Sequence, residues 1–208
     1  MQTQPDLTTR LGGWLFRHRT SLPLPVAIVI LAVPASDAWR SPLVVGSGVV
    51  VTVLGELVRL WGVHHIGVIS RTRSERLGPL VASGPFAMVR NPLYIGNIML
   101  WVGFALTASL VWLAPVIVVL LGAEYHAIVR WEESLLESRL GDRYRVYAAR
   151  VPRWLPTFHL GDRTDGRGGT KKETETDADS WSETFFSERG TLLAIAAGYL
   201  LLWLKARA

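Results

Sequence analysis

Two polar groups in this chain have the residue types and spacing for shared chemistry. The first is Arg90-Asn91-Pro92, and the second is the pair Glu132-Glu133. No charged residue lies between Arg90 and Glu124, and this apolar stretch would be about 50 Å long as a single helix. A hydrocarbon core is about 30 Å thick, so we expect two crossings with a turn near residues 107–110. An even number of crossings brings both polar groups to the same membrane face.

The start of the helix that follows Arg90 offers a place for an anion. Pro92 suits the first turn of a helix, and Asn91 before it is a good N-cap. Free N–H groups there, together with the guanidinium of Arg90, would attract a carboxylate. A structural cap with a snorkelling arginine explains the same residues equally well. Tyr94, one turn into the helix, is either an interfacial anchor or a wall for a ligand ring.

The glutamate pair gives two different side-chain directions. Successive helical positions differ by about 100°, so one of Glu132 and Glu133 faces inward, while the other reaches solvent or an arginine. Arg130 lies three residues before Glu133 and is a candidate partner. His126 and Glu124 lie near the same helix end and, with Glu133, are candidate general bases. A solvated helix turn is the alternative, and the expected common membrane face favours function.

Two other polar groups have structural interpretations. Glu56 in the second apolar run is costly without a partner, and Arg59 is the obvious one; a role in lining the site is the alternative. Adjacent histidines such as His64-His65 point apart on a helix, and no carboxylate lies at ligand spacing. We therefore predict no metal site.

Composition narrows the class of protein. Half of the 208 residues are hydrophobic, nine are Trp, and the formal net charge is +5. Such a chain is too apolar for an ordinary soluble domain. Its positive charges flank apolar runs instead of forming a basic stripe, so we expect no nucleic-acid partner. The absence of cysteine excludes disulfides and thiolate nucleophiles.

These features predict an all-α polytopic membrane bundle of about five spans, with an amphipathic helix at residues 132–150 on the cytoplasmic surface. Arginines beside the spans place the N-terminus and the polar site in the cytoplasm, and composition suggests a bacterial inner membrane. We expect four regions along the chain. Residues 1–21 form a cytoplasmic N-terminus, and residues 22–156 form a core with four spans, of which the first, at 22–35, is marginal in length. Residues 157–189 form a disordered polar linker, and residues 190–208 form a short hydrophobic helix that spans the membrane or lies at its interface.

The motifs resemble those of the isoprenylcysteine carboxyl methyltransferase family, within the integral-membrane methyltransferases that include phospholipid methyltransferases. The resemblance covers roughly Gly55 to Pro156. The matching residues are Leu80-Val81, Ser83-Gly84-Pro85-Phe86, Arg90 to Gly96, Glu132-Glu133, Leu136, Gly141, Tyr144, Tyr147 and Val151-Pro152-Arg153.

The resemblance implies a methyltransferase that uses S-adenosyl-L-methionine in a cytoplasmic pocket and takes a lipophilic substrate from the bilayer. Asn91 stands where the family often has His, and Phe86 where it has Tyr. Arg130 would replace the family's substrate-side arginine, which is not found at Ile128. The cofactor contacts that the resemblance implies are Leu80, Val81, Phe86, Asn91, Pro92, Leu93, Tyr94 and Glu132. We add Arg90 to them, because its positive charge suits the carboxylate of the cofactor. The candidate catalytic residues are Arg130, Glu133 and His126.

Three functions stay open from the sequence. A methyltransferase could act on a carboxylate, thiol, phenol or amine, and only a carboxylate acceptor needs no base. A membrane reductase with a nicotinamide cofactor, similar to sterol reductases, is the second. A non-catalytic membrane scaffold, with purely topological charges, is the third.

Overall fold

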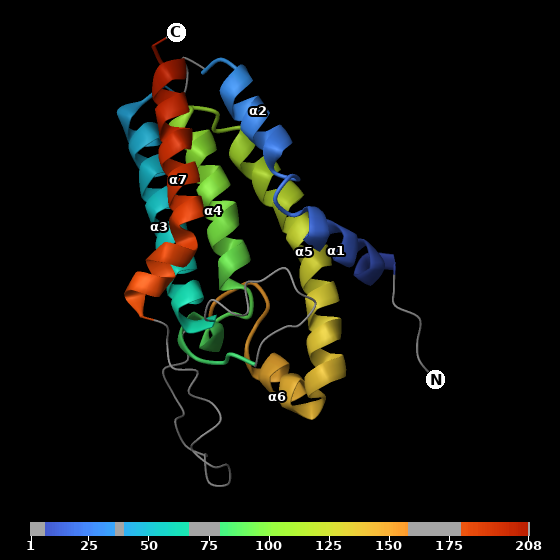
Figure 1. Ribbon diagram of the computed structural model, residues 1–208. Coiled ribbons are helices and arrows are strands. Elements are labelled where there is room, and N and C mark those ends of the chain that lie inside the picture. Colours follow the sequence, from blue (N-terminus) through green and yellow to red (C-terminus); the bar gives the residue numbers. More distant parts are fainter. Residues whose placement is uncertain (1–6, 36–39, 67–79, 158–179, 208) are drawn as a thin grey trace.

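The computed structural model describes residues 7–35, 40–66, 80–157 and 180–207, and within these ranges every regular element is a helix (Figure 1). This confirms the predicted all-α membrane architecture. The elements are α1 (Leu7–His18), α2 (Leu24–Ala32), α3 (Pro42–Ile66), the short 3-10 helix η3 (Gly84–Ala87), α4 (Pro92–Thr107), α5 (Leu113–Leu140), α6 (Asp142–Arg150) and α7 (Trp181–Lys205).

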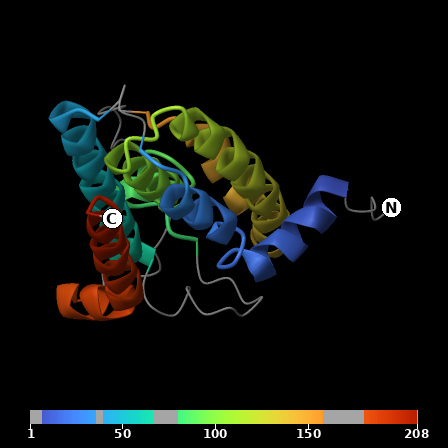
Figure 2. The ribbon, with the colours of Figure 1, turned by 90° about the horizontal axis from the view of Figure 1, so that it is seen from above.

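Three of the described helices, α3, α5 and α7, are long and apolar enough to cross a membrane, and α4 is a shorter apolar helix. Their outward faces carry exposed Leu, Val and Trp side chains, which suits contact with lipid. Figure 2 shows α7 beside α3 at one side of the bundle and α1 beside α5 at the other. The chain is therefore an integral membrane protein.

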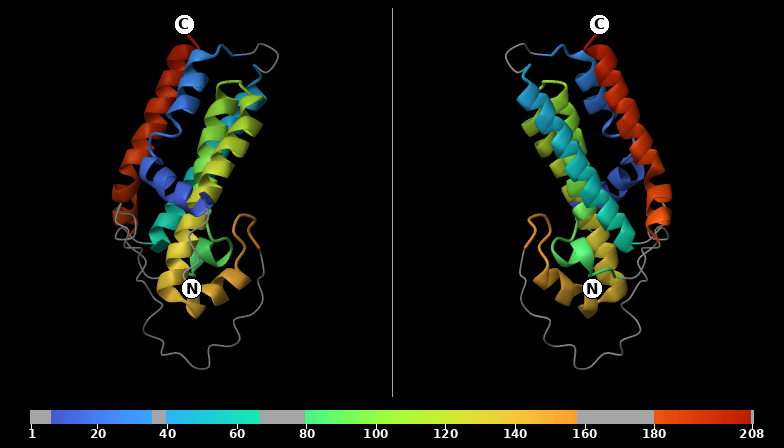
Figure 3. Two further views of the ribbon diagram at one scale, coloured as in Figure 1. Left: turned by 90° about the vertical axis from the view of Figure 1, so that its right-hand side faces the viewer. Right: turned by 90° about the vertical axis from the view of Figure 1, so that its left-hand side faces the viewer.

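The predicted first span at 22–35 takes a different form. Its helix, α2, has nine residues, which corresponds to about 13 Å and is too short to cross a bilayer alone. The Lys205 ammonium of α7 donates to the carbonyls of Ile30 and Val33, each at 2.5 Å, and so satisfies the end of α2. Figure 3 shows these ends of α2 and α7 close together.

Small residues bring α3 and α4 into close contact. A Cβ on Gly55 would lie 2.9 Å from the Gly96 carbonyl, and a Cβ on Gly103 would lie 2.7 Å from the Gly48 carbonyl. Both distances are shorter than real Cβ contacts, so glycine is required for this crossing. Close approach through small residues is the usual way in which helices associate in lipid.

The predicted turn between α4 and α5 is confirmed. The helices end and begin at Thr107 and Leu113, and Ser109 between them has a φ of 59°. Leu110 and Ile117 beyond the turn are fully buried in the core that joins α4 and α5. The hairpin therefore returns the chain to the end of the bundle at which α4 began.

Two elements have other bounds than the sequence predicts. The helix α5 continues to Leu140, where Gly141 with a φ of 55° separates it from α6. The predicted amphipathic helix at 132–150 is thus the last turns of α5 followed by α6. Residues 181–189 of the predicted linker belong to α7. Residues 158–179 of that linker lie outside the described part of the chain.

Candidate functional site

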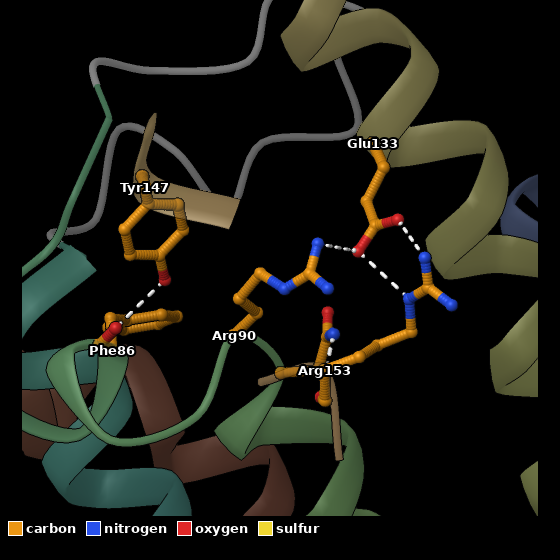
Figure 4. Close-up of polar contacts among 6 residues, drawn as sticks. Phe86, Arg90, Glu133, Tyr147 and Arg153 are labelled. Carbon is orange, nitrogen blue, oxygen red and sulfur yellow. Dashed lines mark hydrogen bonds and ion pairs between the residues drawn. The ribbon is translucent and has the colours of Figure 1, made fainter. Parts of the chain in front are cut away.

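An ion-pair cluster joins three segments at the start of α4 (Figure 4). Arg90, just before α4, donates from Nη1 to Glu133 Oε1 at 2.7 Å. Arg153, which follows α6, donates from Nε to Glu133 Oε1 at 3.0 Å and from Nη2 to Oε2 at 2.6 Å. The predicted meeting of the Arg90 corner with the glutamate pair at one end of the bundle is confirmed.

Residues 151–157, which we call the return segment, lie along the corner that precedes α4. The Arg90 amide donates to the Pro152 carbonyl at 2.9 Å, and the Thr157 amide donates to the Met88 carbonyl at 3.1 Å. The Asn91 side chain donates to the Arg153 carbonyl at 3.1 Å. Asn91 occupies the N-cap position but makes no side-chain cap. The prediction of a capping Asn91 side chain was therefore wrong: its amide holds the return segment.

The second member of the glutamate pair faces α4. The Tyr94 hydroxyl donates to Glu132 Oε1 at 2.9 Å. The Tyr94 ring stacks on Tyr125 with 4.7 Å between centroids. Arg19, after α1, is near enough to Glu132 to interact electrostatically. Glu132 and Glu133 thus point to different partners, as their adjacent positions predict.

The cluster around Glu133 carries an excess of positive charge. Two guanidinium groups share one carboxylate, and Arg90 Nε is buried with no hydrogen-bond partner among the described residues. The N-terminus of α4 adds free N–H groups and a partial positive charge beside Arg90. This corner can therefore accept an anionic group such as a carboxylate.

Two tyrosines of α6 pack on the same corner. The Tyr147 hydroxyl donates to the Phe86 carbonyl at 2.8 Å. Burial raises the pKa of Tyr147 well above its ordinary value, and burial together with the Glu133 carboxylate raises the pKa of Tyr144 to about 12. Both phenols are neutral at physiological pH, so they act here as hydrogen-bonding and packing groups.

The other residues predicted for the site lie around this corner. Val81, Phe86 and Pro92 are buried, and Leu80 is half-buried. The Leu93 side chain packs where α3 has Gly62. His126 stacks on Trp154, with 6.4 Å between ring centroids.

Arg130 lies on α5 with an exposed side chain. The arginines that bind Glu133 in this cluster are Arg90 and Arg153. The pairing of Arg130 with Glu133 stays a prediction. Three contributors were missed: Arg153, whose signal was the Val151-Pro152-Arg153 motif, and Tyr125 and Arg19, for which the sequence offered only polarity near a helix end.

The described ranges contain no group of three or more His, Asp and Glu residues arranged to hold a metal ion. Glu124 Oε1 is buried without a hydrogen-bond partner in this part of the chain.

Comparison with known proteins identifies the family. The model of the phospholipid methyltransferase family matches residues 43–143, from α3 to the start of α6. The chain belongs to this family. The methyltransferase resemblance derived from the motifs is thereby confirmed, and the match includes Arg90, Tyr94 and both glutamates.

Relatives in this family extend the similarity beyond the matched segment. The chain is 30% identical over 156 residues to the nickel-cobalt-cadmium resistance protein NccN of Alcaligenes xylosoxydans xylosoxydans, covering 72% of this chain and 70% of the relative. It is 30% identical over 161 residues to the cobalt-zinc-cadmium resistance protein CzcN of Cupriavidus metallidurans, covering 74% and 71%. No solved structure matches the chain significantly.

Proposed function

We propose that this membrane protein transfers a methyl group from S-adenosyl-L-methionine to a lipophilic acceptor at the cytoplasmic face of a bacterial inner membrane. The observation that carries the proposal is the meeting of Arg90, Tyr94 and the glutamate pair at one end of the α4–α5 hairpin. Family membership supports the reaction class. The arrangement of charges supports the cofactor.

The residues present fit the two charged ends of this cofactor. The corner with Arg90 and the α4 N-terminus suits its amino-acid carboxylate, because a buried Arg90 Nε lacks a partner among the described residues. Glu132 suits its ammonium group or the ribose hydroxyls, and Tyr94 holds that carboxylate in place. The Tyr94–Tyr125 stack supplies a flat apolar wall beside them.

When bound, S-adenosyl-L-methionine supplies an electrophilic methyl group on a sulfonium. The contribution of the chain is then to hold two reactants in line, which is the main source of acceleration for such a transfer. Both oxygens of Glu133 are bound by arginines, so we assign it to holding the corner together. Glu124 and His126 are the candidate bases for an acceptor that must lose a proton.

Calorimetry with S-adenosylhomocysteine tests the cofactor. The purified protein in detergent is expected to bind it, and Glu132→Gln is expected to weaken binding about tenfold, the effect of losing one charged interaction. Glu137→Gln is the matched control, because Glu137 lies on the same helix and is about half exposed. Binding of NADPH instead would contradict the proposal in favour of a reductase.

Cysteine labelling tests the membrane face, since the natural chain has no cysteine. Single cysteines at Ala149 in α6 and Ala206 after α7 are both exposed and lie at opposite ends of the bundle. A membrane-impermeant maleimide added to intact cells is expected to label the cysteine at 206 and not the one at 149. The reverse pattern would place the site outside the cytoplasm.

A labelling assay identifies the acceptor class. Protein in vesicles receives a cofactor with a labelled methyl group, in one arm with an aminophospholipid and in the other with a prenylated thioether carboxylic acid. Incorporation into either lipid fraction supports a lipophilic acceptor. Incorporation into water-soluble acceptors alone contradicts it.

The names of the two relatives suggest a physiological setting. We infer that methylation of a membrane component contributes to tolerance of cobalt, nickel, zinc or cadmium in the host. Growth of a deletion strain on these metals, complemented by the wild-type gene or by Glu132→Gln, tests this. Equal complementation by both would contradict a role for the transfer reaction.

A further inference from the structure

One face of α7 is turned toward the bundle at a regular spacing. Its members are separated by four or three residues in alternation, and each is buried or half-buried: Thr184, Glu188, Thr191, Ile195, Gly198 and Leu202. We call them the docking stripe. Within a bilayer the hydrophobic effect does not drive one helix onto another, because lipid is as apolar as the helix surface. Helices associate there through close packing of small residues and through hydrogen bonds, so the polar and small residues of the docking stripe indicate a specific contact. Figures 1 and 3 show α7 running along α3 and α4.

The central contact of the stripe is an ion pair inside the bundle. Glu188 on α7 is fully buried, and its Oε2 accepts from Arg59 Nη2 of α3 at 2.7 Å. Thr191 Oγ1 accepts from the same Nη2 at 3.1 Å, and Glu56 Oε2 lies 3.3 Å from Arg59 Nε. Charges within a membrane bundle are expensive and usually mark function. The predicted Glu56–Arg59 pair is thus confirmed and completed by a carboxylate from α7.

The same arginine reaches α4 from its other side. Arg59 Nη1 donates to Asn97 Oδ1. This contact depends on Gly96, because a Cβ there would lie 2.6 Å from Arg59 Cγ. The Asn97 side chain interacts with the hydroxyl of Tyr125 on α5. Arg59 therefore links α7 to both helices of the hairpin.

The link ends at the candidate site. Tyr125 stacks on Tyr94, and the Tyr94 hydroxyl donates to Glu132. A continuous series of contacts thus runs from Glu188 through Arg59 and Asn97 to the residue assigned to the cofactor. Glu188 lies outside the segment 43–143 that matches the family, whereas Arg59 and Glu132 lie within it.

We propose that Glu188 is a positioning residue for the candidate site and that α7 is a working part of the enzyme. Through Arg59 and Asn97 it holds the Tyr94–Tyr125 pair in register with Glu132. The inference rests on the proposed function, since the position of this pair matters there for cofactor binding. An α7 that serves only as a membrane anchor would leave cofactor binding independent of Glu188.

Cofactor affinity in a set of variants tests the inference. Glu188→Gln is expected to raise the dissociation constant for S-adenosylhomocysteine about tenfold, and Glu188→Asp is expected to recover part of the loss. Glu183→Gln is the matched control, because Glu183 is an exposed residue in the first turn of the same helix. Thermal unfolding of each variant in detergent shows whether it is folded.

A double-mutant cycle separates positioning from a general loss of stability. Tyr125→Phe removes the interaction with Asn97, so a Glu188 effect that passes through it must shrink in the double variant Glu188→Gln/Tyr125→Phe. If Glu188→Gln fails to fold, Thr191→Val takes its place, because it removes only one hydrogen bond to Arg59.

The outcomes are distinct. Effects of Glu188→Gln and Tyr125→Phe that simply multiply, or a Glu188→Gln protein that binds like the wild type, overturn the inference while the proposed function stands. A folded wild-type protein that binds no cofactor overturns the proposed function, and the inference with it.

Discussion

Glu133 of α5 and Arg153 of the return segment meet through two hydrogen bonds, at 3.0 and 2.6 Å. A guanidinium that binds both oxygens of one carboxylate fixes orientation as well as distance. This pair therefore fixes the return segment against α5, while Arg90 on the same carboxylate fixes the start of α4. Three segments are held by one side chain.

Removing the Arg153 guanidinium from this cluster is expected to weaken the attachment of the return segment to α5. Arg153→Gln should lower the stability of the folded protein by about 1 to 2 kcal/mol, in the range for hydrogen bonds to charged groups that are partly solvated. It should also weaken binding of S-adenosylhomocysteine, because the return segment supports the corner. Calorimetry and thermal unfolding measure both. Arg145→Gln, which removes an exposed ion pair with Glu137, should change neither; equal effects of the two variants would contradict a special role for Arg153.

The hydroxyl of Tyr94 is expected to matter for binding more than for folding. Tyr94→Phe keeps the stack on Tyr125 but removes the donor to Glu132, so the affinity for S-adenosylhomocysteine should fall about five- to tenfold. Tyr199→Phe is the control, since it removes a hydroxyl that donates to Thr52 at 2.8 Å, away from the corner. Unchanged binding by Tyr94→Phe would contradict a role of the Tyr94 hydroxyl in holding Glu132 for the cofactor.

Glycines at the α3–α4 crossing are expected to tolerate no methyl group. Gly103→Ala should destabilise the protein by about 1 to 3 kcal/mol, the range for overpacking, because its Cβ would lie 2.7 Å from the Gly48 carbonyl. Gly122→Ala makes the same change on α5 where nothing lies within 4 Å, and should stabilise by about 0.5 to 1 kcal/mol. Thermal unfolding should give shifts of opposite sign. Equal shifts would mean that the crossing is looser than described.

The buried phenol of Tyr144 is expected to make stability depend on alkaline pH. Its pKa is raised from 10.0 to about 12 in the folded protein, chiefly by burial. The stabilisation is therefore fully present below pH 10 and is lost as the pH rises toward 12, because the unfolded chain releases the proton first. Unfolding of wild type and Tyr144→Phe across this range measures the effect. A decline of the same size in Tyr144→Phe would assign it to other groups.

The position of the candidate site could be predicted from the sequence, whereas the residue contacts within it could be predicted only in part. The uncharged stretch after Arg90 placed the hairpin and brought the corner to the glutamate pair, because span length and parity depend on backbone rise alone. The partner of Glu133 could not be derived in this way. Arg153 reaches Glu133 from beyond α6, so this contact depends on the path of the chain after Gly141, which has a positive φ.

The extent of α7 was the main feature that the sequence left unpredicted. Residues 181–189 contain three charged side chains, which is typical of a linker in solvent. The structure turns Glu188 to Arg59 and leaves Glu183 and Arg189 exposed, so the helix continues through a polar stretch. Only the location of Arg59 in another helix explains why a glutamate belongs at that position. Tertiary contact, and not local pattern, decides this boundary.

The ion pair between Arg59 and Glu188 can form only after both residues have been synthesised. Its members are 129 residues apart, and a ribosome that adds about 5 to 20 residues per second needs roughly 6 to 26 s to make the second after the first. Throughout that interval, Glu188 is not yet available to the Arg59 guanidinium, whereas Glu56 on the same helix already is. A helix made long after α3 thus completes the charge balance around Arg59.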